Sequence, residues 1–195
     1  MIEACTDRLH INAADDAEAA DYAALHRDNA VHFAPWDPPR PPHWSTRAWW
    51  ADALARSDAD ARLGRGARLS LRLRAALGDA SAGTLVGTIG VSAVERGPFQ
   101  NARLGYKLAE RFVGHGLMHE ALVAVLDACF GPLGLHRVEA NHMPENVRSA
   151  AVLDRLGFER HGIAEAYLQI GPDGAFRDHV LRSTRAERWS ARRAR

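Results

Sequence analysis

Cysteine is scarce in this chain. Cys5 and Cys129 are the only two in 195 residues, too few for a disulfide framework or a cysteine-built zinc cage. Cys129 falls within an apolar helical pattern, where cysteine acts as a small hydrophobic residue.

Long apolar runs and an excess of charge are also missing. No stretch approaches the roughly 20 residues that cross a bilayer, and no apolar N-terminal region resembles a signal peptide. The 25 Lys and Arg residues nearly balance 24 Asp and Glu residues, for a net charge of +1. Such a chain has no global field that recruits nucleic acid or an anionic membrane. We expect a cytoplasmic protein with no direct nucleic-acid or membrane partner. The sequence leaves the oligomeric state open.

The length of 195 residues fits one compact domain, which we place at 1–190. The local excess of charge lies at 185–195, where five arginines accompany one glutamate. We interpret this end, and 191–195 in particular, as a frayed and solvated tail rather than an RNA-binding arm.

Hydrophobic periodicity predicts an order of helices, a β meander, then β-α-β-α and a final hairpin. Helices are expected at 15–29, 46–59, after residue 116, and at 147–156. Strands are expected at 69–77 (half-buried), 84–94, 103–108, 137–142, 167–170 and 179–181. The prolines of 33–42 exclude helix and central strand. The fold class is therefore α/β (α+β), with one mixed, mostly antiparallel sheet flanked by helices on both faces.

A glycine turn precedes the third helix, at Gly114-His115-Gly116. A strand, a short loop and a glycine pair before a helix place unpaired backbone N–H groups at the helix N-terminus. These amides and the helix dipole attract a phosphate, and glycines let it approach closely. The turn lacks the features of an NTPase loop and of a dinucleotide fingerprint, and an ordinary turn explains it equally well when it is taken alone.

The surroundings of this turn carry a family resemblance. The segments that share it are 94–99, 104–106, 114–122, 135–137, 141–144, 146, 148–149, 155–158 and 177–181, with Pro35-Trp36. In these segments the chain resembles the GNAT acetyltransferases, and specifically the RimJ branch, which acetylates protein N-termini. The resemblance implies the GNAT fold, acetyl-CoA as cosubstrate, no metal, and a protein N-terminus, such as that of a ribosomal protein, as acceptor. Two alternatives stay open: acetylation of a small amine, antibiotic or amino acid, and a module that binds acyl-CoA without turnover.

The resemblance also fixes the register of the glycine motif. It runs from Val113 to Met118, with Val113 in place of the family's Gln or Arg. Since amides do most of the phosphate binding, we expect the loss of one side-chain contact. The cofactor residues that the resemblance implies are Val113, Gly114, His115, Gly116, Leu117, Met118 and His119, the strand edge Tyr106, Lys107 and Leu108, and Asn146. An N–H near Leu108 is the implied oxyanion donor.

Candidates for catalysis are fewer. Many family members place a tyrosine four residues before the Gly-Phe pair, where this chain has Leu153. The resemblance points instead to Ser149 as a hydrogen-bond donor that stabilises the leaving thiolate, although an ordinary first-turn serine remains the alternative. Asn146 has a simple N-cap as its alternative.

The general base is assigned to Glu139, on the strand beside the expected cleft, with a salt-bridged strand carboxylate as the alternative. Glu120 is explained by the helix dipole without catalysis, and Glu165 is either at the acceptor mouth or in an exposed loop. An α-amine, with a reference pKa near 8, needs roughly 3 kcal/mol less than lysine to become neutral. An N-terminal amine therefore needs only modest help from a base.

Aromatic residues are the candidates for binding the acceptor. Phe33, Trp36 and Trp44, around the prolines, and Tyr167 are expected to line its groove, with a stiff packed loop as the alternative for the first three. His115 and His119 have the spacing of paired zinc ligands, but the metalloprotease glutamate is missing and no third ligand is defined. We expect no metal.

Overall fold

The computed structural model describes residues 2–194. Within them one eight-stranded sheet runs in the order β1-β2-β3-β4-β5-β6-β8-β7. Neighbouring strands are antiparallel except β5 and β6, which are parallel. The strands are β1 (Ala4–Cys5), β2 (Leu9–Ala13), β3 (Ala67–Leu73), β4 (Leu85–Glu95), β5 (Asn101–Leu108), β6 (Arg137–Glu139), β7 (Glu159–Ile170) and β8 (Ala175–Arg185).

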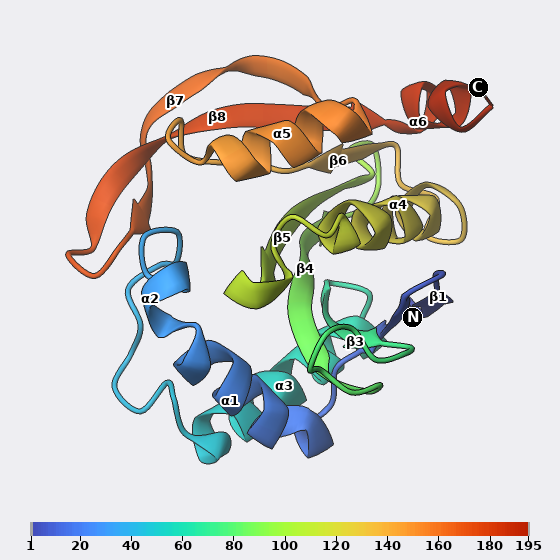
Figure 1. The fold of residues 1–195 in the computed structure, drawn as a ribbon. Helices are drawn as coiled ribbons and strands as arrows, with labels where there is room; N and C mark the ends of the chain where they lie inside the picture. Colours follow the sequence, from blue (N-terminus) through green and yellow to red (C-terminus); the bar gives the residue numbers. More distant parts are fainter. Residues whose placement is uncertain (1, 195) are drawn as a thin grey trace.

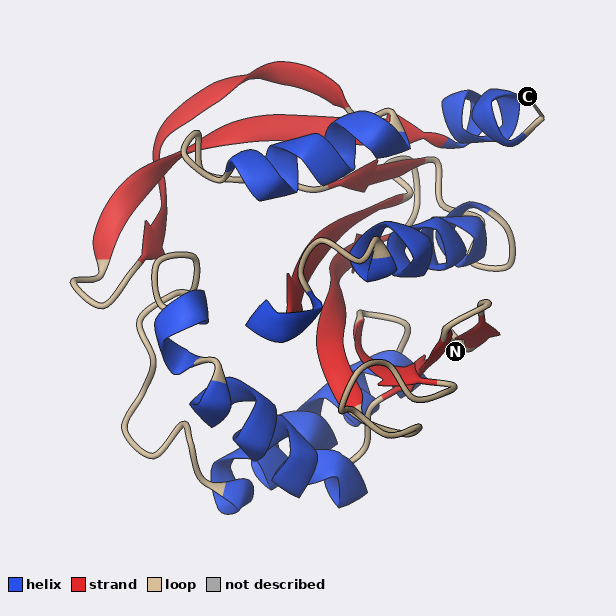
Figure 2. Cartoon of the chain, in the orientation of Figure 1, coloured by secondary structure: helices blue, strands red, loops and turns tan. Residues whose placement is uncertain are grey.

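Helices cover the faces of the sheet and continue the chain beyond the ends of its strands (Figures 1 and 2). They are α1 (Ala19–Asp28), α2 (Ala30–Phe33), α3 (Arg47–Arg62), α4 (Leu117–Phe130), α5 (Val147–Leu156) and α6 (Ala186–Arg193), with short 3-10 turns η1 (Asp16–Glu18) and η2 (Glu110–Phe112). The mixed sheet flanked by helices confirms the predicted fold class.

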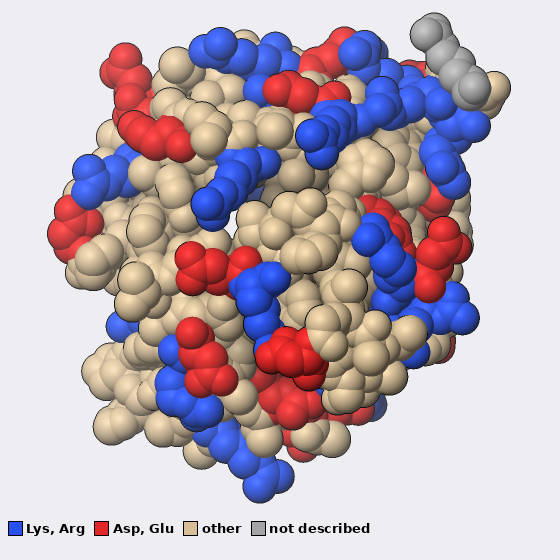
Figure 3. All heavy atoms as spheres, viewed as in Figure 1, with Lys and Arg blue, Asp and Glu red and all other residues tan. Residues whose placement is uncertain are grey.

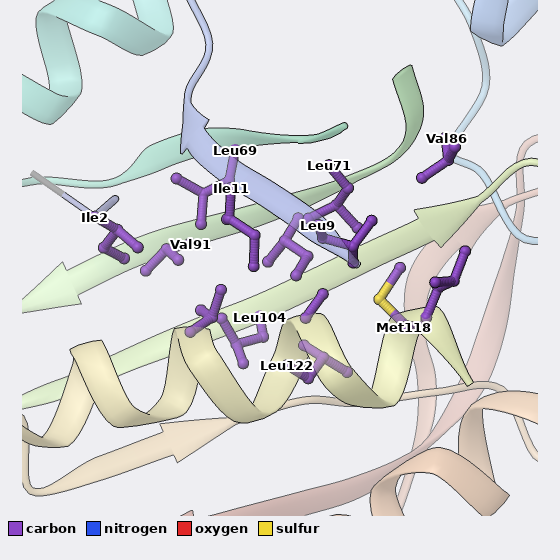
Figure 4. Packing of buried hydrophobic residues seen from close by; sticks show 14 of the residues in the cluster. Ile2, Leu9, Ile11, Leu69, Leu71, Val86, Val91, Leu104, Met118 and Leu122 are labelled. Carbon is purple, nitrogen blue, oxygen red and sulfur yellow. The ribbon is translucent and has the colours of Figure 1, made fainter. Parts of the chain in front are cut away.

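Strand β3 shows why both faces are covered. Leu69 and Leu71 point to the side of the sheet on which α4 lies, beside Leu9 and Ile11 of β2 (Figure 4). Ser70 points the other way, and its hydroxyl lies 3.1 Å from the hydroxyl of the buried Tyr22 of α1. Because successive side chains alternate between faces, helices on both sides cover the strand, and both faces carry buried residues; the predicted half-buried strand is wrong in this respect, although Ala67, Arg68 and Arg72 stay partly exposed.

Several predicted boundaries hold. Helix α5 spans the predicted 147–156, and Gly157 ends it in the left-handed region at φ 78°. Thr46 caps α3 by accepting from the N–H of Trp49, so this helix begins one residue after its predicted start. Asn29 lies just past α1, whose first turn is instead the 3-10 turn η1.

Three expectations are corrected. The short strands β1 and β2 were not expected, and β6 ends at Glu139, three residues before the predicted end. The basic end was expected to fray from residue 185, yet α6 is ordered through Arg193. It is held because Trp189 is buried and its Nε1 donates to Asp127 of α4 over 2.7 Å.

Candidate active site

The site begins where β5 and β6 separate. The two parallel strands pair only at Asn101–Arg103 of β5, whereas β5 stays paired with β4 as far as Leu108. The N–H of Ala109 donates to β4 over 2.8 Å. Because the polar groups of successive strand residues alternate in direction, Tyr106 and Leu108 present their N–H and C=O groups to the side that β6 has left. One edge of β5 is thus open to a ligand.

The glycine turn lies at the end of this open edge. Gly114 and Gly116 have φ values of 90° and 77°, a region that only glycine adopts without strain. Among residues 2–194, the amides of 114–119 have no hydrogen-bond acceptor, and no side chain caps α4. These amides and the positive end of the α4 dipole form a candidate anion site.

The open edge and the glycine turn line one cleft of about 1000 Å³. Figure 3 shows the surface hollowed near the centre of the view, in the region between α2 and α5 of Figure 1. Fifteen of the seventeen residues predicted for the site line this cleft; they are Phe33, Trp36, Tyr106, Lys107, Leu108, Val113, Gly114, Gly116, Leu117, Met118, His119, Glu139, Asn146, Ser149 and Tyr167. The structure thus brings together residues from six segments of the chain.

His115 and Trp44 are the exceptions, since neither lines the cleft. The side chain of His115 is exposed, while its carbonyl accepts from Nη1 of Arg8 over 2.8 Å. Leu117 and Met118 have buried side chains, so only their amides are available to an anion.

A hydrogen-bonded pair of hydroxyls lies in the middle of the cleft. Oγ of Ser149, on the first turn of α5, is 2.7 Å from the hydroxyl of Tyr106 on β5. Burial raises the pKa of Tyr106 to about 12, despite the opposing hydrogen bond to Ser149 and the charge of Arg182. The phenol therefore stays protonated at any ordinary pH. Leu153, at the family's usual tyrosine position, is buried.

Tyr106 was expected only as part of the strand edge, so its hydroxyl is a candidate functional group that the sequence interpretation missed. Its partner is 43 residues away, and the sequence signal was limited to a tyrosine on a strand beside the expected cofactor. Asn146 does act as the N-cap of α5, since its Oδ1 accepts from the N–H of Ser149 over 3.1 Å. Its contact with a cofactor stays a prediction.

The carboxylates are already occupied. Oε1 of Glu139 pairs with Arg137 at 3.1 Å and Oε2 with Arg103 at 3.7 Å, which favours the salt-bridge interpretation over a free base. Glu120 binds the N-terminal segment, with an ion pair of 2.6 Å to Arg8. Glu165 is exposed and does not line the cleft.

The cleft has an excess of positive charge. Two carboxylates, Asp37 and Glu139, line it together with five cationic side chains, which are Arg68, Arg103, Lys107, Arg148 and Arg155. A second hollow of about 670 Å³ adjoins it and shares Gly116, His119 and Arg155 with it. In a chain of net charge +1, this local field favours an anionic ligand.

Within residues 2–194 no group of three or more His, Cys, Asp or Glu side chains is arranged to hold a metal. In the same range no helix is long and apolar enough to span a membrane.

A strand that opens beside a helix N-terminus, with a cleft that holds both, defines an acyl-transferase type of site. The sequence profile of the acetyltransferase (GNAT) domain matches residues 8–159, and the chain belongs to this family of acetyltransferases. It is 34% identical over 185 residues to the ribosomal protein uS5-alanine N-acetyltransferase of Escherichia coli, covering 95% of this chain and 91% of that one.

Solved structures agree. The ribosomal-protein-S5-alanine acetyltransferase of Vibrio fischeri superposes with a TM-score of 0.87 at 28% identity, over 97% of this chain and 99% of that one. Mycobacterium smegmatis RimJ, in complex with CoA-disulfide, superposes with a TM-score of 0.82 at 29% identity, over 96% and 91%.

Proposed function

We propose that this chain transfers the acetyl group of acetyl-CoA to the N-terminal α-amine of a protein, with ribosomal proteins as the acceptor class, and that residues 1–190 form one domain for this purpose. The observation that carries the proposal is the open edge of β5 leading to the glycine turn of α4 inside one cleft. The acceptor class rests on the uS5-alanine N-acetyltransferase of E. coli, which matches along nearly the whole chain.

The cleft fits acetyl-CoA at several points along its length. The free amides of 114–119 suit the pyrophosphate, and the excess of cationic side chains suits its negative charge. The N–H and C=O groups that Tyr106 and Leu108 present along the open edge suit the pantetheine arm and the thioester at its end. Arg155, where the cleft meets the second hollow, suits the nucleotide end.

Acetyl-CoA supplies the thioester, and this chain's residues polarise and align it. The N–H of Leu108 donates to the thioester oxygen while the neutral amine nitrogen bonds to the carbonyl carbon. As the carbon–sulfur bond breaks, the hydroxyl of Ser149 donates to the leaving sulfur, and the hydroxyl of Tyr106 donates to Oγ of Ser149. The amine proton passes to water, since an α-amine with a pKa near 8 is partly neutral at pH 7.

The test is an acetyl-transfer assay with purified protein. Peptides with N-terminal alanine or serine, the same peptides blocked at the α-amine but carrying lysine, and small amines are each mixed with acetyl-CoA. CoA release and the mass of the peptide are measured. We expect one acetyl group on the free N-termini and none on the blocked peptides. Turnover with small amines alone, or CoA binding without turnover on any acceptor, would refute the proposal.

A further inference from the structure

Asp37 is a carboxylate buried within the proline-rich loop. Its Oδ1 lies 2.5 Å from Nζ of Lys107 on β5, and its Oδ2 lies 2.6 Å from Nη2 of Arg40 in the same loop. The guanidinium of Arg40 also stacks over the ring of Trp44, 3.9 Å from its centroid. Both carboxylate oxygens are therefore paired. The contact with Arg40 holds two parts of the loop together, and the contact with Lys107 joins the loop to the sheet.

The backbone of the same residue makes a third connection. The carbonyl of Asp37 accepts from the N–H of Gly171 over 2.8 Å, at the tip of the β7–β8 hairpin. Beside this bond, Cγ of Pro39 lies only 3.2 Å from where a Cβ on Gly174 would be. Three segments that are distant in sequence, the loop after α2, strand β5 and the hairpin tip, meet at this one residue.

These contacts lie at the end of the cleft away from the glycine turn. Phe33, Trp36 and Tyr167 line this end, and Nζ of Lys107 lies over the ring of Phe33 at 5.2 Å. Burial lowers the pKa of Lys107, and the charge of Asp37 opposes that effect. The ion pair needs both partners, because either charge alone would be costly to keep in this enclosed place.

A buried ion pair contributes little net stability compared with apolar residues of the same volume, and its best-supported use is to fix one arrangement of the groups it joins. Around Asp37 those groups are the walls of the acceptor end. The side chain of Asp37 joins the loop to β5, and its backbone carbonyl, together with the close approach of Pro39 to Gly174, joins the loop to the hairpin tip.

We propose that Asp37 is a positioning residue that fastens the three walls of the acceptor end of the cleft, so that a peptide N-terminus meets the thioester in one orientation. This inference rests on the proposed function. It assigns Asp37 to acceptor binding and not to cofactor binding or to chemistry at the thioester.

The test compares Asp37→Asn, and the conservative Asp37→Glu, with the wild-type protein. Loss of one charge-assisted contact corresponds to roughly a tenfold rise in KM for the acceptor peptide. The kcat at saturating peptide and the Kd for CoA should change less than twofold. Asp37→Glu should restore part of the acceptor KM, because it keeps the charge.

Hydrogen exchange provides the second measurement. In Asp37→Asn, faster exchange is expected both in 34–46 and at the hairpin tip 171–174, although the hairpin sequence is unchanged. Asp58→Asn is the matched control, because Asp58 makes an ion pair of the same 2.6 Å length with Arg62 on the exposed side of α3. It should alter neither the acceptor KM nor exchange at the hairpin.

An Asp37→Asn protein with wild-type acceptor KM, or with exchange altered in the loop alone, overturns the inference. A parallel loss of CoA binding also overturns it, since the residue would then support the whole cleft. If the wild-type protein acetylates no peptide, the proposed function fails instead, and the exchange result still reports separately on the contacts of Asp37.

Discussion

Replacing Ser149 by alanine tests the chemistry in the middle of the cleft. Its hydroxyl is the proposed donor to the leaving sulfur, and a hydrogen bond to a charged partner contributes about 1.5–3 kcal/mol. Loss of that bond in the transition state therefore lowers kcat by roughly 10- to 150-fold. The Kd for acetyl-CoA should change little, because the amides of 114–119 and the edge of β5 are untouched.

Ser149 and Tyr106 are joined by a 2.7 Å hydrogen bond. Comparing how much each single variant lowers kcat therefore shows which of the two hydroxyls contacts the sulfur. Tyr106→Phe keeps the ring and removes the hydroxyl that orients Ser149, so a neutral hydrogen bond of about 0.5–1.5 kcal/mol is lost, or roughly 2- to 12-fold in kcat. If Tyr106 acts through Ser149, the double variant should be no slower than Ser149→Ala alone, because residues that act as a unit are not additive.

The assay is CoA release under saturating acetyl-CoA and peptide, with CoA binding measured separately by calorimetry. If Tyr106→Phe is the slower single variant, the phenol contacts the sulfur and Ser149 orients the phenol. If both single variants keep kcat within twofold of wild type, neither hydroxyl stabilises the thiolate and the mechanism is wrong.

Three further predictions concern the cofactor end. Gly116→Ala should lose about 1 kcal/mol of unfolding free energy, because φ is 77° there, and should bind CoA more weakly. The control is Gly64→Ala, where φ is 68° and an added Cβ would meet no atom within 4 Å. It should lose similar stability in thermal unfolding but keep its CoA binding in calorimetry. Burial raises the pKa of Glu120, but hydrogen bonds from the N-terminal segment outweigh it and leave the pKa below its usual value. The stabilisation is therefore present above the unfolded pKa of about 4.3 and is lost as pH falls through the lower native pKa. Glu120→Gln should melt below wild type at pH 7, and the gap should shrink as pH falls below the unfolded pKa; a constant gap would contradict this. Arg155→Gln should weaken CoA binding roughly two- to fivefold and make that binding less dependent on salt. The control Arg56→Gln, at an exposed position, should do neither. If Arg155→Gln binds CoA as tightly as wild type, Arg155 is not part of the site.

Much of the fold was predictable because its elements are long and strongly patterned. Helix α5 and strand β4 lie within a residue of their expected bounds. Hydrophobic periodicity marks both elements, and the cap at Asn146 and the stop at Gly157 also mark the two ends of the helix. Strand β2 was missed although Leu9 and Ile11 alternate with polar residues and are both buried, because five residues are too few to distinguish an edge-region strand from a loop.

The error at the basic end has a different cause. Arginines dominate the composition there, and composition was given more weight than the single apolar residue, Trp189. The structure shows that this ring is buried against α4 and bonded to Asp127, and that Arg188 and Arg193 of the same helix pair with Glu159 and Asp127. The charge pattern described the exposed face of the helix correctly but did not describe its attachment.

The sequence predicted those parts of the candidate site that lie on strand β5 and on the glycine turn before α4. The pairing of Tyr106 with Ser149 and the contacts of Asp37 with Lys107 and Gly171 join segments between 43 and 134 residues apart. Their meeting depends on how far β5 stays paired and on where the hairpin tip reaches. Neither is encoded by local periodicity, so the sequence named many of the lining residues but not their mutual contacts.

The position of the glycine turn follows from the topology. Parallel strands need a crossover connection, usually a helix, and α4 provides it between β5 and β6. The helix must then begin at the end of β5 where the chain leaves the sheet, which is also the end where β5 and β6 separate after Arg103. The amides of 114–119 and the open edge at Tyr106 and Leu108 are consequently neighbours, whatever side chains occupy the turn. This explains how Val113 can replace a polar residue of the motif while the anion site keeps its backbone donors.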